Sequence, residues 1–191
     1  NPYELSLARR RLAFDELFLL RSAMQFFGQE DLPKMQAPVL STDDRVKQGM
    51  SKLRASLPFE LTRSQVEAIN DVLRDLRRPE PMNRLLQGDV GSGKTMVALF
   101  AAAYVGLAGG QSLLMAPTSI LAEQHYATFQ RYFKSIGLRA DLLLGSTKAA
   151  DRRSLAAACQ SGETSILIGT HALLQEDLHF QNLVLAITDE Q

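Results

Sequence analysis

The chain has 191 residues, of which 46% are hydrophobic, a share ordinary for one globular core with or without an appendage. Its 21 basic and 21 acidic residues cancel, which excludes a general electrostatic attraction to nucleic acid, so such a contact needs a local patch or backbone N–H groups. The single cysteine, Cys159, excludes an internal disulfide and suits a reducing compartment such as the cytoplasm. No apolar run approaches the roughly 18 residues of a membrane span, so we expect no membrane partner.

The first part of the chain is predicted to be an appendage. Residues 1–28 are expected to form one long linker helix that stops at Gly28, because apolar residues recur at helical spacing. Its basic triplet, Arg9-Arg10-Arg11, either contacts nucleic-acid phosphates or forms a solvated face. Residues 29–57 are predicted to be a linker rich in Pro, Gly, Ser and Asp, with one short helix from Asp43 to Ala55.

A capping box opens the part of the chain that resembles a motor, predicted over 58–191. Thr62 caps a helix that runs to about Leu76, and Gln65 stands at its third position. Two interpretations of Gln65 remain open: it closes the cap only, or it also contacts the adenine edge of a nucleotide.

The stretch 84–95 carries the most specific motif. Gly88 to Thr95 fits the P-loop pattern, in which glycines turn the backbone so that successive N–H groups cradle phosphate oxygens. Lys94 is predicted to reach the β- and γ-phosphates of ATP and Thr95 to bind Mg²⁺. Leu85-Leu86 is predicted to end a buried strand. The nucleotide-binding candidates are Gln65, Gly88, Asp89, Val90, Gly91, Ser92, Gly93, Lys94 and Thr95.

Short apolar runs then alternate with amphipathic helices. Strands are expected over 112–116, 138–144, 165–168 and 183–188; helices are expected over 96–107, after Thr118 to Ser135, and from Lys148 to Cys159. This alternation predicts an α/β fold, a mostly parallel sheet with helices on both faces. All strands then end at one edge, where ligands bind in such folds.

Two carboxylates follow the last predicted strand. Asp189 is predicted to hold Mg²⁺ and Glu190 to polarise the water that attacks the γ-phosphate. An Asp-Glu pair is a weak signal alone, and its specificity comes from the P-loop upstream. The catalytic candidates are therefore Lys94, Asp189 and Glu190.

Three further loops are expected at the same edge. They combine small or rigid residues with hydroxyl groups, which suits contacts to nucleic-acid phosphates. The candidates are Pro117, Thr118, Ser119, Gly145, Ser146, Gly169 and Thr170. The alternative is that Thr118 and Thr170 act only as helix caps. The three histidines, His125, His171 and His179, show no zinc-binding spacing.

Together these motifs resemble the first RecA-like motor domain of superfamily-two helicases. The match is closest to the RecG family of bacterial ATP-dependent DNA helicases, and it is carried by Leu61–Gln65, Pro81–Thr95, Met115–His125, Gly169–Leu173 and Asp189–Gln191. The helix at Ala8–Leu17 resembles the stretch that joins the DNA-binding wedge domain of that family to its motor. Double-stranded DNA translocases of the transcription-repair coupling type are the nearest alternative.

The resemblance implies hydrolysis of ATP with Mg²⁺ to move on double-stranded DNA, reversing replication forks and migrating Holliday junctions in the bacterial nucleoid. It implies that Gln65 contacts adenine and that Thr118, Gly145, Ser146, Gly169 and Thr170 track DNA or couple it to the nucleotide. The implied partners are branched DNA, a wedge domain and a second motor lobe. We expect the motor domain to be incomplete at its C-terminus and the isolated chain to be weakly active or inactive, because the second lobe supplies an arginine finger. Two alternatives are a nucleotide-dependent DNA-binding scaffold and a P-loop small-molecule kinase, although no arginine-rich lid shows.

Overall fold

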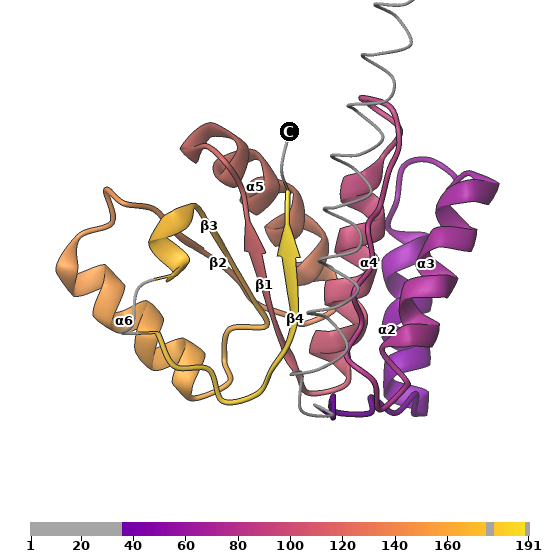
Figure 1. Ribbon diagram of the computed structural model, residues 1–191, viewed down its shortest axis with the longest axis horizontal. Coiled ribbons are helices and arrows are strands. Elements are labelled where there is room, and N and C mark those ends of the chain that lie inside the picture. Colours follow the sequence, from indigo (N-terminus) through magenta and orange to yellow (C-terminus); the bar gives the residue numbers. More distant parts are fainter. Residues whose placement is uncertain (1–35, 175–177, 190–191) are drawn as a thin grey trace, which may run out of the picture. The chain divides into compact units, whose positions relative to one another are not determined.

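The computed structural model describes residues 36–174 and 178–189, so the helix predicted over 1–28 lies outside the described residues. Ala37–Gln191 form one compact unit. Within it, four parallel strands make a sheet of order β2-β3-β1-β4 (Figure 1). The strands are β1 (Gln111–Met115), β2 (Ala140–Leu143), β3 (Ile166–Gly169) and β4 (Leu183–Thr188). The predicted parallel sheet is therefore confirmed.

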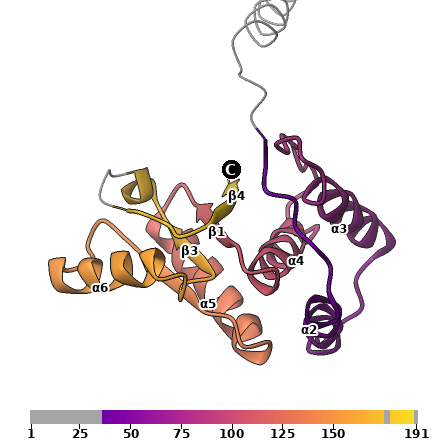
Figure 2. The ribbon, with the colours of Figure 1, turned by 90° about the horizontal axis from the view of Figure 1, so that it is seen from below.

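Helices cover both faces of this sheet, as predicted. On one face lie α4 (Lys94–Leu107) and α5 (Ser119–Ser135); on the other lie α6 (Ala149–Gln160) and the 3₁₀ turn η1 (His171–Leu174) (Figure 2). Successive strand side chains alternate between the faces. In β1, Leu114 joins the core under α4 and α5, while Leu113 and Met115 pack into a smaller core with Cys159.

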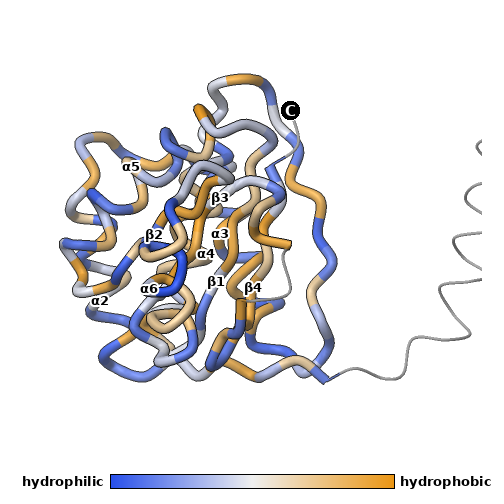
Figure 3. The backbone as a smooth tube through the Cα atoms, turned by 90° about the vertical axis from the view of Figure 1, so that its left-hand side faces the viewer, coloured by the Kyte–Doolittle hydropathy of each residue, from blue (hydrophilic) through white to orange (hydrophobic). Residues whose placement is uncertain are grey.

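Helix α4 is apolar on nearly every side because it is covered on both sides. The sheet lies against one side, and α2 (Asp44–Ala55) and α3 (Arg63–Asp75) pack against the other. Figure 3 shows the hydrophobic residues gathered along the strands and α4. Val46 and Leu53 of α2 are buried, so this helix, predicted within the 29–57 linker, packs as part of the compact unit. No helix in the described ranges is both long and apolar enough to cross a membrane.

The prediction that a buried strand ends at Leu85-Leu86 is wrong. This segment has no strand pairing, and Leu85 is 81% exposed. The physical reason is the lack of a backbone partner: among the described strands β4 pairs with β1 alone, and the segment joins neither. Arg84 instead attaches it to α3, since its Nε and Nη2 donate to Oδ2 of Asp75 at 2.9 and 2.7 Å.

Candidate nucleotide and nucleic-acid site

The carboxyl ends of the four strands meet in one row. In the sheet register, Gly169 lies between Leu143 and Met115, and Met115 pairs on its other side with Thr188. The loops that follow these residues therefore leave the sheet along one edge. Their spatial order is the turn after β2, then Thr170, then 116–119, then Asp189.

The P-loop lies at this same edge. Helix α4 packs on β1 and β4 and is joined to β1 by the short turn 108–110, so the helix runs antiparallel to the strands. Its first residue, Lys94, thus lies at the end where the strands finish (Figure 1). The tertiary structure therefore brings the P-loop and Asp189, about 100 residues apart in sequence, to one edge of the sheet.

Two glycines of the P-loop have the left-handed backbone conformation that a tight phosphate-binding turn uses. Gly91 and Gly93 have φ angles of 78° and 83°, in the left-handed region that favours glycine. A Cβ atom at Gly88 would lie 2.7 Å from Oγ of Ser92, so a side chain there would crowd the loop. The cap residue of α4, Gly93, makes no side-chain cap bond, which leaves N–H groups of the first turn for a phosphate. Asp89 and Val90 are exposed at the tip, and Thr95 is the second residue of α4.

Lys94 turns its ammonium onto this loop. Its Nζ donates to the carbonyl oxygens of Gly88 and Asp89 at 2.7 and 3.1 Å. A phosphate oxygen forms a stronger, charge-assisted bond than a neutral carbonyl does. A phosphate bound in the loop could therefore replace these carbonyls as the acceptor for the ammonium of Lys94.

Gln65 makes two contacts at once. Its Oε1 accepts from the N–H of Thr62 at 2.9 Å and closes the predicted capping box. Its Nε2 donates to the carbonyl of Ser92 in the P-loop, also at 2.9 Å. The cap interpretation of Gln65 is confirmed, and the side chain also reaches the phosphate loop. A contact with adenine stays a prediction.

Asp189 is bonded on both its backbone and its side chain. Its N–H donates to the carbonyl of Met115 at 2.8 Å. Its Oδ2 lies 2.7 Å from Nε2 of His125, a side chain only 11% exposed. From the sequence, His125 shows only the lack of a metal-ligand partner, and its bond to Asp189 is not predicted. The missed signal is helical spacing: Ala122 and Phe129, on either side of it, are fully buried on α5. Glu190 lies outside the described residues.

The first candidate DNA loop, 117–119, is exposed, and Thr118 caps α5 by accepting from the N–H of Leu121 at 3.3 Å. In the second loop, Gly145 and Ser146 are exposed in a turn closed by Thr147, whose Oγ1 accepts from the N–H of Leu144 at 3.0 Å. Residues 117–119, 145 and 146 are therefore accessible to a binding partner. Contacts with DNA stay a prediction.

The third loop is less open. Gly169 is buried as the last residue of β3, and a Cβ atom there would collide with the carbonyl of Leu143. Glycine at this position is explained by the close approach of two strands. Thr170 is half-buried, and its carbonyl accepts from the N–H of Leu173 at 2.9 Å.

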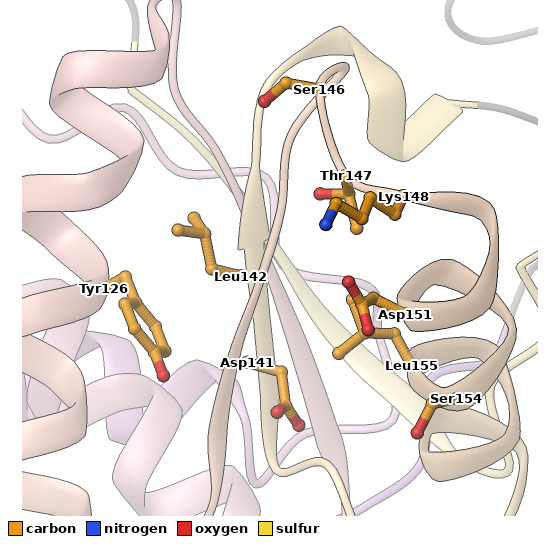
Figure 4. Close-up of a pocket in the computed structure, with 9 residues that line it drawn as sticks. All are labelled: Tyr126, Asp141, Leu142, Ser146, Thr147, Lys148, Asp151, Ser154 and Leu155. Atoms are coloured by element: carbon orange, nitrogen blue, oxygen red, sulfur yellow. The ribbon is translucent and has the colours of Figure 1, made fainter.

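A pocket of about 530 Å³ opens beside the second loop, between α5, β2 and α6 (Figure 4). Its lining includes Ser146, Thr147, Lys148 and Asp141. Asp141 already has partners, since Nε of Arg139 lies 2.9 Å from its Oδ2 and the hydroxyl of Thr164 donates to it at 2.7 Å. The carboxylate of Asp141 is therefore already paired within the protein.

Comparisons with known proteins agree with this geometry. The family model for the DEAD/DEAH box helicase matches residues 62–191. The chain is 46% identical over 191 residues to the ATP-dependent DNA helicase RecG of Synechocystis sp. and 43% identical over 200 to that of Aquifex aeolicus. Both alignments cover 100% of this chain, but 23% and 25% of those proteins.

A solved structure of RecG bound to a three-way DNA junction resembles the chain with a TM-score of 0.81 and 42% identity. This likeness covers 99% of this chain and 25% of that one, so the chain spans about a quarter of the length of its relatives. Because the helicase family model matches more than half of the residues, the chain belongs to the DEAD/DEAH box helicase family, whose domain binds nucleotide.

Proposed function

We propose that the chain is the first motor lobe of an ATP-dependent DNA helicase that remodels branched DNA by fork reversal and branch migration. The observation that carries this proposal is the shared sheet edge, where the P-loop, Asp189 and the three loops converge. Similarity over the whole chain to proteins named RecG supports the choice of branched DNA over other helicase substrates.

The P-loop suits the phosphates of ATP. In this proposal the uncapped start of α4 and the ammonium of Lys94 together attract the phosphates. In this proposal Lys94 binds the β- and γ-phosphates, and Gln65 supports the loop through Ser92 while contacting adenine.

The residues also suit Mg²⁺, on the condition that the nucleotide supplies ligands. In the described part of the chain no group of three or more His, Cys, Asp or Glu residues is placed to hold a metal. Mg²⁺ typically uses one or two protein oxygens, waters and substrate phosphates, a set that Thr95 and Asp189 complete. When bound, the ion neutralises charge on the transferred phosphoryl group. Glu190 is proposed to orient the attacking water.

Pro117, Thr118, Ser119, Gly145, Ser146, Gly169 and Thr170 are proposed to face the DNA backbone, Gly169 through its backbone alone. The proposed partners are a second motor lobe, which completes the nucleotide site, and a wedge domain that engages the junction. The proposed location is the bacterial cytoplasm, at the nucleoid.

The test uses the full-length protein that contains this chain. ATP hydrolysis is measured with fork, Holliday-junction and linear duplex DNA of equal length. We expect the branched substrates to stimulate most and Lys94→Ala to abolish hydrolysis on all of them. A preference for linear duplex would favour the coupling-type translocase, and DNA binding without hydrolysis would favour the scaffold.

A further inference from the structure

We propose that His125 is a positioning residue that holds the carboxylate of Asp189 in the orientation needed at the nucleotide site. The inference rests on the proposed function, because it takes Asp189 to be the metal-binding carboxylate. It adds a role for His125, which ends the stretch Met115–His125 but is given no function there.

The geometry of the pair carries the argument. Nε2 of His125 lies 2.7 Å from Oδ2 of Asp189. A carboxylate that binds a metal ion can only accept, so in the proposed site Nε2 is the donor in this bond. The bond engages Oδ2 and leaves Oδ1 for a metal ion or its bound water. The side chains are 11% and 29% exposed, so water competes weakly for the contact.

The two residues are fixed by separate elements. The backbone of Asp189 is tied to β1 through the carbonyl of Met115 at 2.8 Å. His125 stands on α5 between the fully buried Ala122 and Phe129, which restricts movement of its backbone. Without the imidazole, the carboxylate would keep its backbone anchor but gain rotation about its side-chain bonds.

Carboxylates that bind metals are commonly oriented by a neighbouring hydrogen bond, and removal of such a partner typically costs roughly 10–100-fold in metal affinity or activity. We therefore expect the loss of His125 to act on the use of Mg²⁺. Uptake of ATP by the P-loop in the absence of Mg²⁺ should be unaffected.

The experiment compares His125→Ala and His125→Gln in the full-length protein. Glutamine places an amide N–H near the position of Nε2 and should restore the bond. His179→Ala, at an exposed histidine outside the site, is the matched control. Two quantities are measured: affinity for a fluorescent ATP analogue with and without Mg²⁺, and the Mg²⁺ concentration that gives half-maximal ATP hydrolysis.

For His125→Ala we expect unchanged analogue affinity without Mg²⁺, loss of most of the gain that Mg²⁺ confers, and a half-maximal Mg²⁺ concentration raised roughly 10–100-fold. His125→Gln and His179→Ala should stay close to the parent. Should His125→Ala lower the melting temperature, His125→Asn, whose amide stops short of Asp189, is the second loss-of-contact variant.

Unchanged Mg²⁺ dependence in His125→Ala would overturn the inference, as would failure of His125→Gln to restore it at an unchanged melting temperature. Lys94→Ala separates the two proposals. If it leaves hydrolysis intact, the proposed function fails; if it abolishes hydrolysis while the His125 variants behave as the parent, this inference alone fails.

Discussion

Gln65 donates its amide to the carbonyl of Ser92 at 2.9 Å, across 27 residues of chain, while the same side chain closes the cap of α3. One residue thus links the start of α3 to the phosphate loop. The two contacts use different atoms of the amide, so they can be separated by substitution.

Gln65→Glu keeps the oxygen that accepts from Thr62 but loses the donor to Ser92. We expect it to retain the cap of α3 and to weaken ATP binding, whereas Gln65→Ala should lose both contacts, each worth about 0.5–1.5 kcal/mol of unfolding free energy. Chemical denaturation and binding of ATP and of tripolyphosphate measure these effects. Weakened tripolyphosphate binding shows that the amide supports the loop; weakening confined to ATP would contradict that and favour contact with adenine.

Gly169→Ala should destabilise the fold. The added methyl group would collide with the backbone carbonyl of Leu143, which cannot move without breaking the register of β2 and β3. Overpacking of this kind costs roughly 1–3 kcal/mol. Gly145→Ala is the control, because a Cβ atom added there would meet nothing within 4 Å and the φ of Gly145 is not positive. Equal denaturation midpoints for the two variants would contradict the packing argument.

The Arg84–Asp75 ion pair should hold the segment before the P-loop against α3. The side chains are 37% and 19% exposed, and Arg84 donates twice to one carboxylate oxygen. A double-mutant cycle with alanine is expected to give a coupling free energy towards the upper end of the roughly 0.2–1 kcal/mol found for such pairs. The same cycle on Arg63–Glu67, exposed 92% and 61%, is the control. A larger coupling free energy for Arg63–Glu67 than for Arg84–Asp75 would contradict the claim that Arg84 holds this segment against α3.

We expect the free energy of unfolding to fall at alkaline pH because of the buried thiol of Cys159. Burial raises the pKa of its thiol above the ordinary value, an effect that outweighs the lowering by the neighbouring Thr164 side chain. A raised folded-state pKa means that the stabilisation by the neutral thiol is complete below the unfolded-state value and is lost as pH rises through the folded-state value. Denaturation of the parent and of Cys159→Ala at pH 7 and pH 10 measures this. The parent should lose more stability than the variant, and equal losses would contradict the prediction.

The sequence by itself determined the local structure. The capping box at Thr62 and Gln65 and the cap at Thr118 act within a few residues, so pattern alone placed α3 and α5, and helical spacing placed α6. The alternation of apolar strands and helices likewise predicted a parallel sheet, because period and length distinguish the two elements.

The tertiary structure decided everything that depends on neighbours distant in sequence. Leu85-Leu86 has the composition of a strand, but a strand requires a backbone partner, and none of the described strands provides one. Helix α2 was predicted within a linker because its short apolar stripe shows no partner until α4 covers it. The bond between His125 and Asp189 spans 64 residues and exists because the first part of α5 and the residue after β4 lie at the same edge of the sheet, a relationship that local periodicity does not encode.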